Sequence, residues 1–332
     1  MKALRSHAVG GPETLTLDEV DVPVPGPGQV LVAVKACAIN YPDGLIVRDL
    51  YQFKPERPFS PGGEIAGVIE AIGEGVEGWQ VGDRVLAGIG NGGLAEKVCV
   101  AAARMFKVPE GVSFEKAASL MMTYGTTIHG LKDRGHIKPG DVMLVLGAAG
   151  GVGLSAVELG KAFGARVIAA VSSEAKGEVA RKAGADDVVI YPRDAMDKDA
   201  SKDLANRFKA ACGPDGANIV YDIVGGQYSE PALRAIAWEG RFLVVGFPAG
   251  IPKMPLNLTL LKSCDICGVF WGAFTAREPE KFRAQADELF DLMASGKIDP
   301  LISETFPLER GGDAIAKLEA REAVGKLVVT MD

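Results

Sequence analysis

The segment LGAAGGVG (146–153) carries the clearest chemistry in this 332-residue chain. Ala148, Gly150 and Gly153 place small residues where a dinucleotide-binding fingerprint needs them, with alanine in the place of the first glycine. Small residues let the backbone approach a pyrophosphate, which the positive end of the following helix stabilises. A strand over 142–146 and a helix after the glycines complete the expected context, which favours a nucleotide-binding loop over a bare turn. The predicted contact residues are Ala149, Gly150, Gly151 and Val152.

The end of the next predicted strand, over 166–171, indicates which nucleotide binds. An NAD-binding unit expects an acidic residue there, to accept a hydrogen bond from the ribose 2′-hydroxyl. This chain has Ser172 and Ser173, followed by Glu174 and Lys176. Neutral hydroxyls and an ammonium group favour a 2′-phosphate, so NADPH is the predicted cofactor. Glu174 keeps NADH open as the alternative, because a shift of one residue would restore the acid.

Cys264 and Cys267 form a CxxC pair, a spacing that both zinc sites and redox pairs use. No second ligand pair accompanies them, and the three histidines show no partnering spacing. Residues three apart in a strand also point to opposite faces, which makes shared ligation awkward. We therefore expect structural cysteines and no metal, with a redox or metal role as the alternative. Five cysteines spread through a long chain favour a reducing compartment.

The elements that position these residues follow two patterns. The first third consists of short β-type runs separated by Gly/Pro turns, such as TLTLDEV, QVLVAVKACAI, IAGVIEAIG and DRVLAGI. From about residue 141, β-branched runs alternate with helical stretches, and their continuous apolarity suits strands buried on both faces. The predicted fold class is α/β, a Rossmann-type doubly wound parallel sheet plus a β-rich domain, which the tail from about 278 rejoins.

Bulk properties exclude several function classes. The net charge of −7 argues against nucleic acid or an anionic membrane surface as a partner. No apolar run is long enough to span a bilayer, and the N-terminus lacks the apolar core of a signal peptide. The expected location is the cytoplasm.

Five stretches together resemble the zinc-free quinone oxidoreductase branch of the medium-chain dehydrogenase/reductase superfamily. They are GPGQVLVAVKACAINYPDGL, PFSPGGEIAGVIEAIGEGVEGWQVGDRV, GAAGGVGLSAVELGKAFGARVIA, AGADDVVIY and YDIVGG, and the likeness covers nearly the whole chain. The resemblance implies a GroES-like catalytic domain over 1–124, an NADPH-binding Rossmann domain over 125–266 and a return to the catalytic domain over 267–332. It also implies a homodimer, paired through the strand region near 267.

The same resemblance assigns the cofactor site. It places Ser172, Lys176, Tyr191 and, more weakly, Arg321 around the 2′-phosphate, and proximity in sequence adds Arg193. It places Gly225, Gly246 and Phe247 beside the nicotinamide and Thr127 at a helix start in the cofactor cleft. Where zinc alcohol dehydrogenases of this superfamily have cysteine and histidine ligands, this chain has Asn40 and Gly63, so no catalytic zinc is expected. No flavin is expected either.

Without zinc, the expected reaction is hydride transfer from NADPH to a small electrophile, a quinone or an α,β-unsaturated carbonyl. Asn40 and Tyr51 match polar positions of the quinone reductase cleft, and Asp43 matches a bracing aspartate. Each also has a structural interpretation, since Asn and Asp commonly stabilise turns and Tyr51 could be a packing residue whose hydroxyl meets solvent. An enoyl-CoA substrate is the first alternative, with Arg48, Lys54 and Arg57 as its phosphate groove. An NADPH-binding protein without significant turnover, as in crystallin-like or RNA-binding members, is the second.

Overall fold

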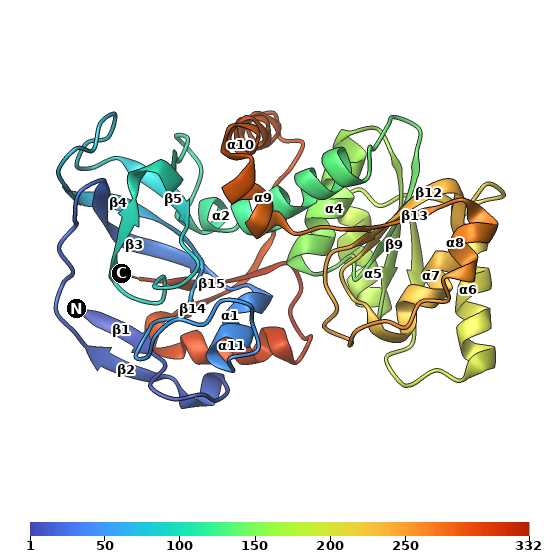
Figure 1. Cartoon of the computed structure of the whole chain (residues 1–332), viewed down its shortest axis with the longest axis horizontal. Coiled ribbons are helices and arrows are strands. Elements are labelled where there is room, and N and C mark those ends of the chain that lie inside the picture. The colour runs from blue at the N-terminus through green and yellow to red at the C-terminus, as the bar shows by residue number, and fades with distance from the viewer. Residues whose placement is uncertain (332) are drawn as a thin grey trace. The chain divides into compact units, whose positions relative to one another are not determined.

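The computed structural model describes residues 1–331, which divide into two compact units (Figure 1). The first unit combines Met1–Met122 with the segment from Pro300 onwards, and the second is Thr123–Asp299. Both chain ends therefore belong to the first unit. Among the described residues no helix combines the length and apolarity needed to cross a bilayer.

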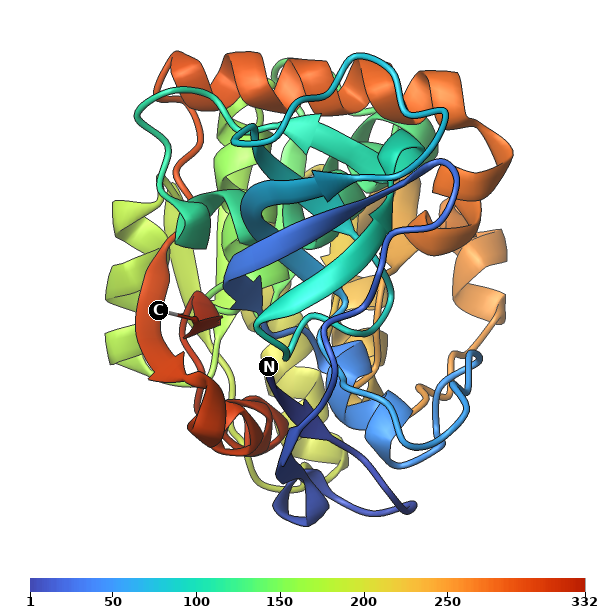
Figure 2. The same ribbon diagram turned by 90° about the vertical axis from the view of Figure 1, so that its left-hand side faces the viewer.

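The first unit is built on a curled seven-stranded mixed sheet. Its strand order is β14-β15-β3-β4-β5-β7, and β6 pairs with β3 off this path. In Figure 2 these strands cross one another, as expected for a strongly twisted sheet. The strands of the unit are β1 (Lys2–Arg5), β2 (Thr16–Glu19), β3 (Gln29–Ala38), β4 (Glu64–Ile72), β5 (Arg84–Gly88), β6 (Lys97–Ala101), β7 (Met105–Lys107), β14 (Ile302–Pro307) and β15 (Lys326–Thr330). Its helices are α1 (Tyr41–Val47), α2 (Phe114–Ala118) and α11 (Gly311–Glu319).

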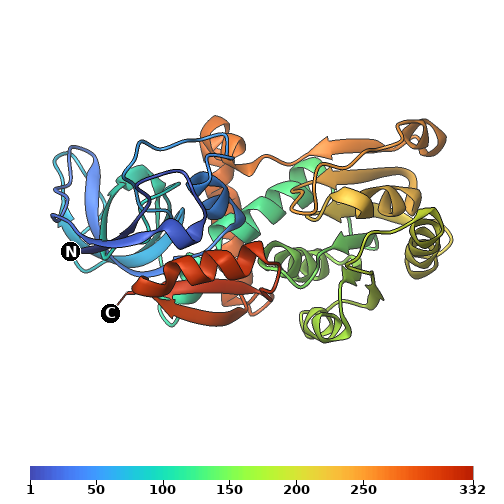
Figure 3. The same ribbon diagram turned by 90° about the horizontal axis from the view of Figure 1, so that it is seen from below.

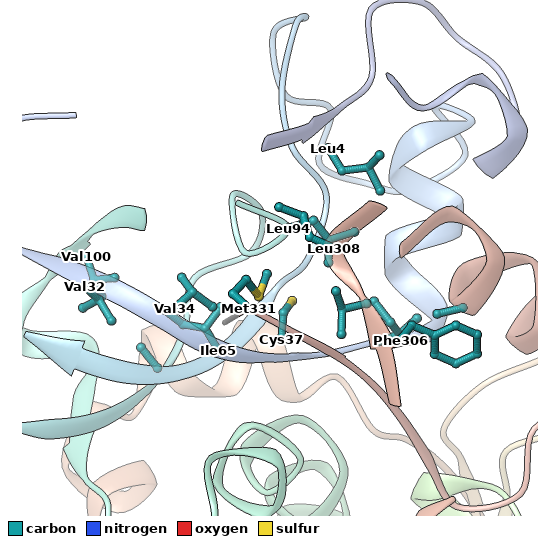
Figure 4. Packing of buried hydrophobic residues seen from close by; sticks show 14 of the residues in the cluster. Leu4, Val32, Val34, Cys37, Ile65, Leu94, Val100, Phe306, Leu308 and Met331 are labelled. Carbon is teal, nitrogen blue, oxygen red and sulfur yellow. The ribbon is translucent and has the colours of Figure 1, made fainter. Parts of the chain in front are cut away.

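Both ends of the chain contribute to one core in this unit. Strand β3 supplies Val32, Val34 and Cys37, and β15 brings the C-terminal segment alongside it in antiparallel register. Figure 4 shows Val34 and Cys37 beside Met331, which lies almost three hundred residues away in sequence, with Phe306 at the other end of the same cluster from Val32. Helix α11 packs against β14 and β15, as Figure 3 shows. The tail therefore completes the core of the first unit.

The second unit is built on a six-stranded sheet in which every pair is parallel. Its strand order is β10-β9-β8-β11-β12-β13, so the order reverses between β8 and β11. This is the doubly wound arrangement that binds dinucleotides at the carboxyl edge. The strands are β8 (Val142–Leu146), β9 (Arg166–Val171), β10 (Asp187–Ile190), β11 (Ala217–Asp222), β12 (Ile236–Val244) and β13 (Asp265–Gly268). The helices are α3 (Thr126–Ile128), α4 (Gly151–Ala162), α5 (Glu174–Lys182), α6 (Lys198–Cys212), α7 (Ser229–Arg234), α8 (Asn257–Lys262), α9 (Trp271–Arg277) and α10 (Pro279–Ala294).

The predicted fold class is confirmed, and two details differ from the sequence analysis. The chain leaves the second unit after Asp299, whereas the return was expected at 267. The difference arises because β13 joins the parallel sheet through β12 and helices α9 and α10 follow it. The strand region near 267, expected in the catalytic domain, is therefore part of the second unit.

Candidate functional site

The carboxyl edge of the parallel sheet gathers most of the predicted cofactor residues. The glycine loop follows β8, the serine pair follows β9, Tyr191 follows β10, Gly225 follows β11 and Gly246 follows β12. Because all six strands run the same way, these loops emerge at one edge, around the point where the strand order reverses. Residues spread over a hundred positions of sequence are therefore brought to one site.

The glycine loop turns tightly between β8 and α4. The fingerprint had placed the turn residue at Ala148. Gly147 has φ +71°, so the residue that makes the turn lies one position earlier. A Cβ on Gly153 would lie 2.2 Å from the Gly147 carbonyl oxygen, so only glycine lets α4 approach β8 this closely. Gly150 is the N-cap of α4, and no side chain caps it. The first amide groups of the helix are thus available to an anion.

The residues after β9 include a lysine, Lys176, that lies close enough to Arg193 to feel its charge. Ser173 caps α5, and its Oγ accepts a hydrogen bond from the Lys176 amide at 3.3 Å. Glu174, the residue that kept NADH open, pairs with Arg181 at 2.5 Å. Burial lowers the pKa of Lys176, and the charge of Arg193 lowers it further. Two cations near each other are a favourable place for a phosphate.

The loops after β11 and β12 are joined to each other. A Cβ on Gly225 would lie 2.6 Å from the Phe247 Cβ, and this glycine has φ +70°. The Gly226 amide donates to the Gly250 carbonyl at 2.7 Å. A side chain at position 225 would therefore force the two loops apart, which explains the glycine there. Gly246, the other residue predicted beside the nicotinamide, lies in the second of these loops.

Thr127 lies in the interior of the second unit. Its side chain is fully buried, and its hydroxyl bonds to Ser155 Oγ at 2.7 Å and to Tyr221 Oη at 3.0 Å. This geometry favours a role in anchoring α4 and β11 over direct contact with a cofactor. The neighbouring Thr126 is only half-buried, a difference that the pair of identical residues in the sequence does not reveal.

Asn40 and Asp43 lie together in the interior of the first unit. The Asp43 carboxylate is buried and accepts hydrogen bonds from the amides of Asn40, Gly62 and Gly63, at 2.7, 3.1 and 3.1 Å. Burial raises the pKa of Asp43 to about 6, against the lowering effect of these bonds and of the Lys326 charge. The carboxylate thus ties the start of helix α1 to the glycine pair before β4.

Sequence reasoning missed two further members of this cluster, Glu64 and Lys326. Lys326 Nζ donates to Asn40 Oδ1 at 2.6 Å and lies 3.9 Å from Glu64 Oε2. Asn40 Nδ2 donates in turn to Glu64 Oε2 at 3.2 Å and to the Ala38 carbonyl at 3.2 Å. Burial raises the pKa of Glu64 and lowers that of Lys326. A lysine inside the apolar run GKLVVT was the sequence signal that could have revealed the pair.

The cluster does not have the donors of a zinc centre. Its carbonyl and carboxylate oxygens face an ammonium group, and zinc sites prefer thiolate and imidazole ligands. Over residues 1–331, no three His, Cys, Asp or Glu side chains are arranged to hold a metal ion. The five cysteines are free thiols, and Cys264 and Cys267 are both buried without a disulfide between them.

Tyr51 is half-buried near Asp43. Burial raises the pKa of its hydroxyl, and the Asp43 charge raises it further, so Tyr51 is a protonated donor at neutral pH. Arg321, also in the first unit, follows helix α11 and has φ +59°.

The groove expected for a CoA phosphate is not formed as predicted. Arg48 donates two hydrogen bonds to Glu319, at 3.1 and 3.0 Å. Arg57 pairs with Asp49 at 2.7 Å. Both arginines therefore serve internal contacts of the first unit, which leaves Lys54 as the exposed cation of the three.

Known proteins resemble this chain over its whole length. A family model described as alcohol dehydrogenase GroES-like domain matches residues 26–110, and one described as zinc-binding dehydrogenase matches residues 151–291. A protein named quinone oxidoreductase-like protein 2 homolog, from Nematostella vectensis, is 38% identical over 308 residues, which cover 92% of this chain and 82% of that protein. Human quinone oxidoreductase is 30% identical over 334 residues, which cover 100% of this chain and 98% of that protein.

Solved structures agree with these relatives. The mycobacterial protein Rv1454c, complexed with NADPH, has a TM-score of 0.91 at 33% identity, with 100% of both chains covered. Escherichia coli quinone oxidoreductase, also complexed with NADPH, has a TM-score of 0.90 at 29% identity, again with 100% of both chains covered. The chain is an oxidoreductase that belongs to the medium-chain dehydrogenase/reductase superfamily, in its quinone oxidoreductase branch.

Proposed function

We propose that this protein is a zinc-independent, NADPH-dependent reductase of quinones or α,β-unsaturated carbonyl compounds. The observation that carries the proposal is the uncapped start of α4 at the same sheet edge as the Lys176–Arg193 pair. An uncapped helix start suits a pyrophosphate and the cations suit a 2′-phosphate, so together they fit NADPH. The NADPH complexes of two structural relatives support this assignment.

The cofactor would be held by the residues of that edge. Ala149, Gly150, Gly151 and Val152 would border the pyrophosphate, and Ser172, Ser173, Lys176, Tyr191 and Arg193 the 2′-phosphate, with Arg321 as a further candidate from the first unit. Gly225, Gly246 and Phe247 would border the nicotinamide. We propose that the half-buried Thr126, rather than the buried Thr127, faces the cofactor. When bound, NADPH supplies a hydride to an electrophilic carbon or a quinone.

Tyr51 is the proposed donor to the developing oxyanion of the acceptor. Its hydroxyl stays protonated at neutral pH, which a donor requires. Asn40 is proposed to act indirectly, because both of its amide hydrogens and its carbonyl oxygen already bond inside the protein. Asp43 would hold the start of helix α1 in place through its hydrogen bond with the Asn40 amide.

A panel of acceptors tests the function. NADPH oxidation is measured in EDTA with an ortho-quinone, a para-quinone, a 2-enone and crotonyl-CoA, and each assay is repeated with NADH. We expect turnover of the quinones or the enone with NADPH, and a fall of about tenfold or more in kcat for Tyr51→Phe. Tyr41→Phe, at an exposed tyrosine of the same segment, is the matched control.

Other outcomes would redirect the proposal. A preference for crotonyl-CoA would move the substrate to the thioester class, for which Lys54 is the cation still exposed. NADPH binding without turnover of any acceptor would favour a binding role. Stoichiometric zinc together with alcohol oxidation would contradict the proposed chemistry.

We also propose a homodimer that forms through β13. This strand lies at the end of the six-stranded sheet, so one of its edges has no strand beside it. Apolar side chains are exposed on or near it, namely Leu256, Leu260, Leu261, Ile266 and Phe270. A second copy could pair with this edge and cover them. Light scattering should give twice the chain mass, and Leu260→Lys should shift the protein towards monomer, whereas Val24→Lys, at an exposed residue of the first unit, should not.

A further inference from the structure

Asp222 is a buried carboxylate at the last position of β11, and it has no role in the cofactor binding or the hydride transfer proposed for this protein. Its side chain is 1% exposed. Oδ1 accepts hydrogen bonds from the Val224 and Gly225 amides at 2.9 and 2.8 Å, and Oδ2 accepts one from Ser229 Oγ at 2.5 Å. The carboxylate therefore holds the loop that contains Gly225 in place.

The main chain of the same residue holds the second loop. The Asp222 carbonyl accepts hydrogen bonds from the Val245 and Gly246 amides, at 2.9 and 3.3 Å. The Ala249 amide then donates to the Val224 carbonyl at 2.9 Å and joins the two loops. One residue thus lies between both loops that are proposed to border the nicotinamide.

The charge of Asp222 is balanced by hydrogen bonds rather than by a cation. The interactions that lower its pKa are hydrogen bonds alone, and no neighbouring cation is among them. Burial raises the pKa of the carboxyl group, and the three donated hydrogen bonds favour its ionised form. A buried anion without a cation attracts any positive charge that forms nearby.

We propose that the Asp222 carboxylate stabilises bound NADP⁺ relative to bound NADPH and so favours hydride release. The inference rests on the proposed function, in which Gly225, Gly246 and Phe247 border the nicotinamide. Hydride transfer removes one hydrogen nucleus and two electrons from the dihydronicotinamide ring, which becomes positively charged. The acceptor gains that hydride and then one proton from solvent. Asp222 is thus a positioning residue whose charge matches the oxidised ring.

Binding measurements at pH 8 separate this role from a structural one. Dissociation constants of NADP⁺ and NADPH are measured for the wild type, Asp222→Asn and Ser229→Ala. The new amide oxygen can still accept from Val224 and Gly225, so Asp222→Asn removes the charge and keeps most of the geometry. We expect the ratio Kd(NADP⁺)/Kd(NADPH) to rise about tenfold in Asp222→Asn. In Ser229→Ala, which keeps the charge and loses one hydrogen bond, the ratio should stay within about twofold of the wild-type value.

The outcomes distinguish this inference from the function on which it rests. An unchanged ratio in folded Asp222→Asn, with both nucleotides bound, overturns the inference alone. A wild type that binds neither nucleotide overturns the proposed function. If Asp222→Asn does not fold, Asp222→Ser provides a second neutral variant with the same expected ratio. Failure of both neutral variants to fold would mean that Asp222 serves the fold, and would overturn the inference too.

Discussion

In the first unit the polar side chains around Asn40 bond to one another, whereas in the second unit the loop before α4 has no side chain that caps it. The ammonium of Lys326 and the carboxylates of Asp43 and Glu64 are all buried in one network. Gly150, by contrast, is the N-cap of α4, and no side chain accepts a hydrogen bond from the first amides of this helix. Buried groups that satisfy one another indicate a structural cluster, and an uncapped helix start indicates a place for a ligand.

The contrast also separates the two kinds of charge in the molecule. Lys326 lies between two carboxylates, while Lys176 has Arg193 as the charge that most affects it. A cation among anions supports the fold, and two neighbouring cations are a favourable place for an anionic ligand. A change at Lys326 should therefore alter stability, and a change at Lys176 should alter cofactor binding.

Lys326→Met gives the largest expected effect. The substitution leaves Glu64 and Asp43 buried without their cation, so we expect the free energy of unfolding to fall by about 3–5 kcal/mol. Urea denaturation measures it. Lys2→Met is the matched control, because the Lys2–Glu309 pair is exposed to solvent and its loss should change the free energy of unfolding much less. A loss for Lys326→Met no larger than that for Lys2→Met would mean that the cluster is not structural.

The Asp43 carboxyl group predicts a pH dependence. Its pKa is about 6 in the folded chain and near 3.8 ordinarily. Between these values the folded state binds the proton and the unfolded state does not, so the stability contribution falls as pH rises through this window, by about 3 kcal/mol in total. The difference in unfolding free energy between wild type and Asp43→Asn should show this slope between about pH 4 and 6 and level off above about pH 7. A pH-independent difference would contradict it.

The same contrast explains what could be predicted from sequence. The strands 142–146 and 166–171 were predicted to the residue, because continuous β-branched runs bounded by Gly and Asp leave few alternatives. The glycine loop was found because its chemistry lies in consecutive positions. Glu64 and Lys326 were missed because they lie in different strands and meet only through tertiary packing. Thr126 and Thr127 could not be told apart, since burial rather than residue type distinguishes them.

Lys176→Ala should alter cofactor selectivity rather than stability. Loss of the ammonium removes one partner of the 2′-phosphate, so kcat/KM for NADPH should fall about 10- to 100-fold, while that for NADH changes less than about twofold. Steady-state kinetics with both nucleotides measures this. Lys182→Ala, at an exposed lysine of the same helix, is the control. An equal loss for both nucleotides would indicate that Lys176 contacts a group that the two cofactors share.

Gly150→Ala should leave the fold intact and weaken NADPH binding. Its backbone has φ −79° and ψ 170°, which alanine adopts freely, and the added Cβ would lie 3.7 Å from the Gly147 oxygen, an ordinary contact. The Tm should therefore change little, while the methyl group occupies space proposed for the pyrophosphate and lowers NADPH affinity about tenfold. Protein fluorescence titration measures that affinity.

Gly153→Ala is the contrasting variant of the same loop. Its Cβ would lie 2.2 Å from the Gly147 oxygen, a backbone clash that must move α4, so it should lower the Tm as well as the affinity. If Gly150→Ala instead bound NADPH as tightly as the wild type, the approach of a pyrophosphate to this loop would be refuted. If it lost stability as Gly153→Ala does, Gly150 would serve the fold rather than a ligand. The start of α4 would then be structural, like the buried cluster around Asn40.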